Sequence, residues 1–190
     1  MMDGPTISKS TAYSVLHGTL EATNSCPDLA IAWPDDDRLD HVAVGLGHAA
    51  GKASWTAAPD VCLITLCITL PIVAVRVKAI CSARYIFTAA CISCPGNTNE
   101  RTAWNMSNVK SKVEMLPDRY YIIGDTGYPP SDHAFNFFHS QARIPVDQAF
   151  DILVMTWGIL WKPLRVSLHN TGRIVHACMR LHNFNRKRRM

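Results

Sequence analysis

The sequence predicts an α/β domain in which helices flank a central sheet. Apolar, β-branched runs lie in the middle of the chain, and amphipathic helix patterns stand before, between and after them. A length of 190 residues is sufficient for one domain with its own core. With 48% apolar and 18% charged residues, the composition excludes a disordered chain. Eleven prolines and ten glycines without a period exclude collagen-like and coiled-coil proteins.

The first 40 residues predict a short N-terminal helical segment. Between residues 8 and 23 apolar side chains recur at helical spacing, which predicts a helix with one buried face; they are Ala12, Val15, Leu16 and Leu20. Ser8 or Ser10 is suited to cap its start. Residues 25–40 are acidic and irregular, and we expect a connector there with a short helix after Pro34.

The central part of the chain predicts buried strands. The run from Val61 to Val75 is the most apolar, and its 15 residues, interrupted by Pro71, fall short of the roughly 20 that a membrane helix needs. Its β-branched content indicates strands, with a membrane span as the alternative. Further strands are expected near 73–80 and 85–92, joined by a tight turn at Ala83 and Arg84.

Helical patterns dominate the remainder of the chain, apart from one more strand. Residues 98–113 have helix-like content with a cap at Asn97 or Thr98, and residues 120–124 are a continuous apolar run typical of a central strand. Pro145 is expected to open a helix over 145–158. Its apolar face is Val146, Ala149, Phe150, Leu153 and Trp157. A last helix is expected near 172–184.

Two aspartates are candidate ligands of a hard cation. Asp125 directly follows the 120–124 strand, at the carboxyl end where α/β folds place ligand chemistry, although turn formation alone also explains it. Asp147 lies in the first turn predicted for the Pro145 helix, where an acid also favours the helix dipole. If the helix packs against the sheet, the two carboxylates meet at the strand end and begin a Mg²⁺ site.

The cysteines and histidines allow a second metal hypothesis. Cys91 and Cys94 form a CxxC pair, and Cys178 with His182 has the spacing of a zinc half-site. The 83 residues between the two halves make zinc much the weaker hypothesis. The odd total of seven cysteines and a start without a signal-peptide pattern predict reduced thiols, in the cytosol or nucleus.

Charge is distributed unevenly along the chain. Residues 1–40 carry seven acids and two bases, whereas residues 151–190 carry eight bases and one acid. Four of those bases are consecutive, Arg186, Lys187, Arg188 and Arg189, in a chain whose net charge is +4. Such a cluster predicts a nucleic-acid contact or a nuclear-import signal, with a solvated chain end as the alternative.

Three motifs follow one another in the second half of the chain: residues 121–129 (YIIGDTGYP), 135–150 (FNFFHSQARIPVDQAF) and 180–183 (RLHN). Their sequence and order resemble the DDE endonuclease domain of PIF/Harbinger-type transposases. Upstream, residues 77–85 and 94–104 are similar to the family's strand pair and its PGSTxDxTAW loop. Residues 7–17 are similar to the helix-turn-helix segment that precedes the nuclease domain.

The resemblance implies a ribonuclease-H-like fold that binds two divalent cations, Mg²⁺ or Mn²⁺, through two aspartates and a glutamate. By this resemblance Asp125 is the second acid, and Asp147 occupies the third position, where the family has glutamate. The GxxDG strand that carries the first acid has no counterpart in this sequence. Asp60 is a weak candidate to replace it.

The resulting organisation has three parts. We expect an N-terminal helical segment, a helix-turn-helix remnant, at residues 1–40, an endonuclease-like domain at 41–185 and a basic tail at 186–190. The resemblance implies a DNA phosphodiester substrate, activity impaired by the missing acid, and a nuclear location, with the cytoplasm as the alternative. We further expect a protein partner or a homo-oligomer, and, from the shortness of the apolar run, no membrane association. The alternative function is a catalytically inactive, transposon-derived DNA- or protein-binding protein.

Overall fold

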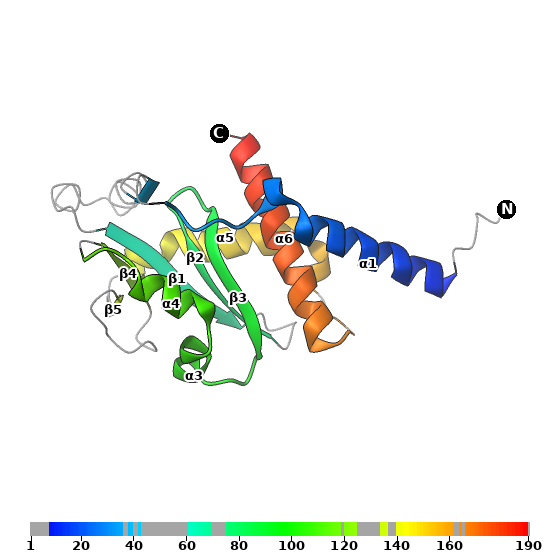
Figure 1. Ribbon diagram of the computed structural model, residues 1–190, viewed down its shortest axis with the longest axis horizontal. Coiled ribbons are helices and arrows are strands. Elements are labelled where there is room, and N and C mark those ends of the chain that lie inside the picture. Colours follow the sequence, from blue (N-terminus) through cyan, green and yellow to red (C-terminus); the bar gives the residue numbers. More distant parts are fainter. Residues whose placement is uncertain are drawn as a thin grey trace.

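The computed structural model describes residues 8–35, 38–39, 42, 61–69, 75–118, 120–124, 134–136, 140–161, 164 and 166–189. The fold is mixed α/β, with a central sheet, a long helix α6 across it and a helix α1 that projects away from the body (Figure 1). The sheet has five strands in the order β3-β2-β1-β4-β5.

The strands confirm the predicted sheet. They are β1 (Val61–Thr69), β2 (Val75–Cys81), β3 (Phe87–Pro95), β4 (Tyr120–Gly124) and β5 (Ala134–Asn136). Strands β1, β2 and β3 are antiparallel neighbours, whereas β4 runs parallel to β1 and β5 parallel to β4. The short strand β5 was not predicted, because three residues are too few to show a period. The described part of the chain contains no helix long and apolar enough to cross a membrane.

The helices differ from the prediction mainly at their ends. They are α1 (Lys9–Ser25), α3 (Glu100–Asn105), α4 (Asn108–Glu114), α5 (Ser140–Thr156) and α6 (Leu168–Arg188), with 3-10 turns η1 (Pro27–Leu29) and η3 (Gly158–Trp161). The helix expected over 98–113 is two helices, capped by Asn99 and Ser107 instead of Asn97 or Thr98. Ser107 divides them because its extended backbone and hydroxyl start a new helix.

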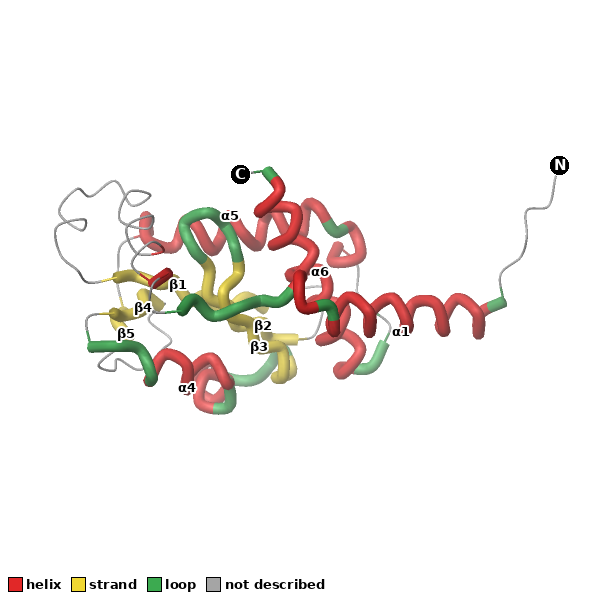
Figure 2. The backbone as a smooth tube through the Cα atoms, turned by 45° about the horizontal axis from the view of Figure 1, so that its top comes forward, coloured by secondary structure: helices red, strands yellow, loops and turns green. Residues whose placement is uncertain are grey.

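The sheet separates two apolar clusters. On one face, α5 and α6 pack their apolar side chains against alternate residues of β2, including Val77 and Ala79. On the other face, Trp104 of α3 and Val109 of α4 pack against Ile80. Figure 2 shows the strands between α5 and α4. We call these the α5–α6 face and the α3–α4 face.

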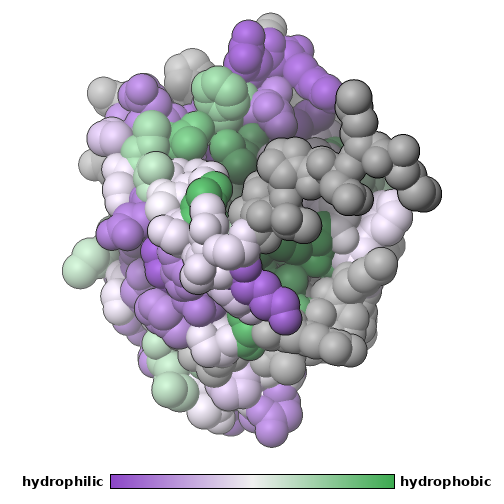
Figure 3. All heavy atoms as spheres, turned by 90° about the vertical axis from the view of Figure 1, so that its right-hand side faces the viewer, coloured by the Kyte–Doolittle hydropathy of each residue, from purple (hydrophilic) through white to green (hydrophobic). Residues whose placement is uncertain are grey.

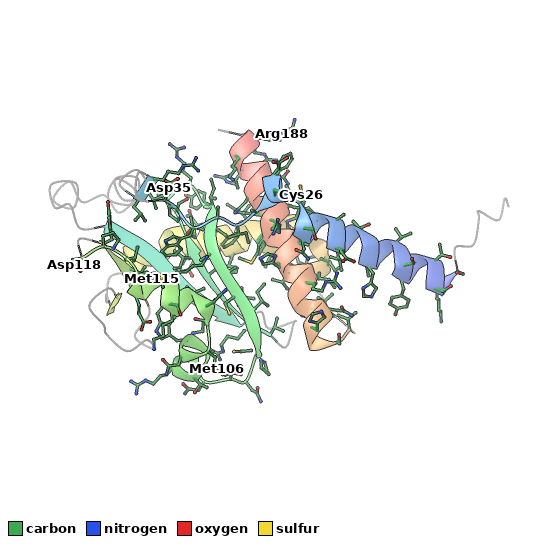
Figure 4. All side chains as sticks on the ribbon, in the orientation of Figure 1. Cys26, Asp35, Met106, Met115, Asp118 and Arg188 are labelled. Carbon is green, nitrogen blue, oxygen red and sulfur yellow. The ribbon has the colours of Figure 1, made fainter. Side chains whose placement is uncertain are left out.

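The predicted buried face of α1 is wrong for most of its length. Ser8 caps the helix as expected, accepting a hydrogen bond from the Thr11 N–H, and Leu20 is buried. Val15 is 63% exposed, however, because only the C-terminal half of α1 reaches α6. There Asn24 Nδ2 donates to the Arg173 carbonyl at 3.1 Å, and the Arg180 guanidinium donates to the Cys26 carbonyl. Figure 4 shows Cys26 at this junction beside α6.

The turn predicted at Ala83 and Arg84 is a β2–β3 hairpin with one strained residue. The Ser82 N–H donates to the Ile86 carbonyl, and Tyr85 has a φ of 61°. A turn followed by a left-handed residue is a common three-residue hairpin loop, in which that position usually holds glycine. Tyrosine there costs on the order of 1–2 kcal/mol, so we expect tertiary contacts to hold it.

Candidate functional site

The predicted metal site adjoins the carboxyl end of β4, and the register between strands defines its neighbours. Strand β4 ends at Gly124, and Asp125, the next residue in the sequence, lies outside the described residues. β1 pairs with β4 in parallel, with Val61 opposite Tyr120 and Ile64 opposite Ile123. β1 therefore continues past the end of β4, and its sequence, VCLITLCIT, contains no carboxylate.

Asp147 lies inside α5 and not in its first turn. α5 begins at Ser140, so the start predicted at Pro145 is wrong, and Asp147 is the eighth helical residue. The dipole interpretation of Asp147 fails for the same reason, because that effect is confined to the first turn. Asp147 is half-buried, next to Val146 at 0% exposure, on a helix that packs against β1, β2 and β4. The expected helix-on-sheet arrangement is thus confirmed, while the approach of the two carboxylates stays a prediction.

Asp60 also lies outside the described residues, but the strand it precedes is described. The next residue, Val61, opens β1 opposite Tyr120, four residues before Gly124. The two strand ends that adjoin Asp60 and Asp125 are therefore about 13 Å apart along the sheet. This spacing does not favour Asp60 as a partner of Asp125.

The zinc hypothesis gains no support from the described residues, which contain no group of three or more potential metal ligands. Cys94 lies near the end of β3, whereas His182 contacts the hairpin before β3 begins. Burial raises the pKa of the Cys178 thiol to about 11, with a smaller opposing effect of a backbone hydrogen bond. Metal binding requires the thiolate, and forming it from this buried thiol costs more than from an exposed cysteine.

His182 and Asn183, which end the RLHN motif, fasten α6 to the outer strand of the sheet. Asn183 Oδ1 accepts from the Phe87 N–H at 2.8 Å, and Asn183 Nδ2 donates to the Phe87 carbonyl at 2.7 Å. His182 Nε2 donates to the Tyr85 carbonyl at 2.7 Å. These bonds satisfy the N–H and carbonyl of Phe87 at the outer edge of β3 and hold the strained Tyr85. His182 is thus a packed residue of the fold.

Burial lowers the pKa of His182. The hydrogen bond to Tyr85 raises the pKa in part, and the nearby charge of Arg186 lowers it further. His182 is therefore neutral at physiological pH and donates from Nε2. This state suits a structural bond to a carbonyl.

The basic cluster continues α6 and is not a separate irregular end. Arg186, Lys187 and Arg188 form the last turn of the helix, where positive charge is favourable. Arg186 lies over the Tyr85 ring, 5.1 Å from its centroid, and Arg188 lies over Phe184 at 5.6 Å. Hydrophilic side chains gather where α6 ends, at the top of Figure 3, and Figure 4 labels Arg188 there.

Comparison with known proteins gives one family match. A sequence model described as DDE superfamily endonuclease matches residues 73–183, more than half of the chain. The match begins just before β2 and ends at Asn183, so it includes the β2–β3 hairpin, β4, α5 and most of α6. No curated protein and no solved structure matches the chain.

Proposed function

The chain belongs to the DDE superfamily endonucleases, and on this premise we propose that it is a PIF/Harbinger-type domain for cutting DNA phosphodiester bonds whose metal site is incomplete. A ribonuclease-H-like fold is part of the proposal. The mixed sheet with β1 at its centre, and the packing of α5 on β1 and β4, support it.

Asp125 and Asp147 are the residues that we assign to the cation. In this family the bound divalent metals activate a water or 3′-hydroxyl and stabilise the leaving oxygen. The protein's own contribution is to bring a carboxylate from a strand end and another from a helix to one place. Asp147 has one methylene less than the family's glutamate, so its carboxylate reaches less far from the α5 backbone.

The absence of an acid from β1 is the observation that carries the proposed impairment. β1 neighbours β4 in the sheet, so it is the strand from which a third carboxylate would reach Asp125. Two carboxylates supply little charge and few oxygens to a cation that otherwise keeps its water. We therefore infer weak metal binding and cleavage far below that of a complete triad.

A nicking assay tests the proposed nuclease. Purified protein is incubated with a labelled DNA duplex and Mn²⁺, and Asp125→Ala is the active-site control. We expect slow nicking that Asp125→Ala abolishes. Nicking that Asp125→Ala leaves unchanged would show that the activity comes from elsewhere and would remove the proposal.

Calorimetry with Mn²⁺ tests the ligand assignment separately. Mn²⁺ is the probe because it accepts oxygen ligands. We predict binding in the millimolar range, roughly 4 kcal/mol, that is lost in Asp125→Asn and survives in Asp60→Asn. Equal loss of Mn²⁺ binding in both variants would mean that Asp60 replaces the first acid, and the inference of an impaired site would then be wrong.

A second candidate function follows from the same missing acid. A chain without cleavage activity retains the basic end of α6 and the surfaces of the fold, so it would act as a DNA- or protein-binding protein in the nucleus. The discriminating result is DNA binding that persists in EDTA together with no nicking in Mn²⁺. The basic residues 186–189 support this candidate and a nuclear location.

A further inference from the structure

A pocket of about 490 Å³ lies between three segments that are far apart in the sequence. They are the connector after α1, the β2–β3 hairpin and the last turns of α6. We call it the hairpin pocket. Cys81, which precedes the hairpin, pairs with Ile64 of β1, so the hairpin lies towards the end of the sheet where β1 begins. It is separate from the candidate metal site beyond the carboxyl end of β4.

The interior of the hairpin pocket is mainly aliphatic. Its small apolar side chains come from the connector and the hairpin, and they are Ala30, Ala32, Val42, Ala83 and Ile86. Ser82 and Thr88 add two buried hydroxyl groups. This size and composition are typical of sites that bind apolar groups with a few polar contacts.

The aromatic side chains of the pocket are already engaged. The Phe87 ring is 1% exposed and lies 5.1 Å from the ring centroids of both Phe150 and His182. Lys112 lies over the Trp33 ring, 5.8 Å from its centroid. A site for unpaired nucleotides presents aromatic faces on which bases stack. The pocket therefore favours an aliphatic guest over a base.

Three cations border the pocket, one from each segment. Arg38 belongs to the connector, Arg84 to the hairpin and Lys187 to α6, and all three are exposed. The Arg38 guanidinium has a carboxylate oxygen of Asp35 3.7 Å away, with both side chains more than 60% exposed. Such an exposed pair is worth roughly 0–1 kcal/mol, so the guanidinium can turn to an incoming carboxylate while Asp35 keeps its hydrogen bond from the Arg38 N–H.

We propose that the hairpin pocket binds a short segment of an acidic protein partner, with an aliphatic side chain inside and flanking carboxylates on Arg38, Arg84 and Lys187. Complementarity supports this partner. The apolar interior suits an aliphatic side chain, and the cationic rim suits acidic residues on either side of it in the peptide. This site does not depend on the proposed nuclease, and it can exist whether or not the metal site works.

Fluorescence anisotropy with the full chain tests this site. The probe is a short fluorescein-labelled peptide that alternates leucine with glutamate. Comparison peptides alternate serine with glutamate and leucine with lysine, and a single-stranded oligonucleotide is the competitor. We expect the leucine–glutamate peptide to bind at least about tenfold more tightly than either comparison peptide, which corresponds to about 1.4 kcal/mol.

Two variants locate the binding. Ala32→Trp fills the pocket from an exposed position, and Lys187→Glu reverses one rim charge; each should weaken peptide binding at least about tenfold. Lys9→Glu makes the same charge change at the far end of α1 and should leave binding unchanged. Thermal unfolding followed by circular dichroism confirms that the variants are folded.

Three results would overturn the proposal. Equal binding of the serine–glutamate peptide would show attraction by charge alone. Unchanged binding in Ala32→Trp would place the peptide elsewhere. Oligonucleotide binding that is lost in both variants, without peptide binding, would make the pocket a nucleic-acid site.

Discussion

At the residue scale, the buried side chain of Asn183 joins α6 to β3. Its side-chain amide binds both the N–H and the carbonyl of Phe87, at the outer edge of β3, beside which the described residues form no further strand. Asn183 is 3% exposed, so water cannot readily replace the amide. Asn183 belongs to the RLHN motif of the resemblance, and its hydrogen bonds to Phe87 give it a structural role.

Asn183→Ala should destabilise the fold by roughly 2–4 kcal/mol, because two buried backbone groups lose their partners. Unfolding in urea, followed by circular dichroism, measures the change. Asn185→Ala, on the same helix but exposed, is the matched control and should change stability by less than about 0.5 kcal/mol. Similar losses in both variants would contradict the role assigned to Asn183.

Two of the three histidines of α6, His176 and His182, predict how stability depends on pH. Burial lowers the pKa of both His176 and His182, and the charges of Arg180 and Arg186 lower them further, against a smaller raising effect of the Tyr85 bond on His182. The unfolded chain therefore binds more protons than the folded one below about pH 6.5. Stability should be fully present above that pH and fall as the pH drops from there towards the folded-state pKa values.

Urea midpoints measured from about pH 7.5 to pH 5 test this pH dependence. His182→Gln keeps an amide donor for the Tyr85 carbonyl and removes one titrating group, so its midpoints should change less with pH. A wild-type midpoint that rises as the pH falls through this range would show the opposite sign and reject the prediction.

At the scale of elements, α6 combines two uses of its basic residues. Arg186 is half-buried over Tyr85, and its Nε is buried. Lys187, Arg188 and Arg189 are exposed. The four consecutive bases are therefore not equivalent, although the sequence presents them as one cluster.

If the end of α6 binds DNA, the three exposed bases should account for the dependence of DNA affinity on salt concentration. Exchanging Lys187, Arg188 and Arg189 together for glutamine should reduce the slope of log affinity against log salt concentration by roughly 2.7, about 0.9 for each phosphate contact. Arg186→Gln should leave that slope nearly unchanged and lower the thermal stability instead. DNA titrations at several salt concentrations measure this slope. Equal effects of all four residues on it would contradict the distinction between Arg186 and the three exposed bases.

At the scale of the whole molecule, the strand register identifies the β1 position from which a further carboxylate would reach the proposed metal site. Leu66 of β1 pairs with Ala79 of β2, whose side chain belongs to the α5–α6 face, and Leu66 lies two positions beyond the Ile64–Ile123 pair. This β1 position is therefore just past the end of β4, opposite a residue of the α5–α6 face. Cys67, the next residue, pairs with Lys78, which lies over Trp104 on the opposite face.

Leu66→Asp should strengthen Mn²⁺ binding at least about tenfold, because it adds a carboxylate on the face of Asp147. Without metal the same change should lower stability by about 1–3 kcal/mol or more, since it places a charge in the sheet. Thermal unfolding with and without Mn²⁺ separates the two effects. Cys67→Asp is the control on the other face and should lose stability without gaining metal affinity; equal gains would reject the assignment.

Local patterns were sufficient to predict most elements of the fold. Hydrophobic period and β-branched content located β1, β2, β3 and β4, and the spacing from Val146 to Leu153 identified the buried face of α5. These predictions succeeded because a side chain's burial in a strand or helix follows from the repeat of the backbone itself. The position of Asp125 after a strand is a prediction of the same kind.

Contacts between distant segments decided the remainder. Whether Val15 is covered depends on how far α1 extends beyond α6, and the role of Asn183 depends on β3 being the outer strand. The same holds for the choice of Leu66 as the position to test with an added carboxylate and for the hairpin pocket, which joins three separate segments. No periodic pattern encodes register, strand order or docking, because these follow from which surfaces meet when the whole chain packs.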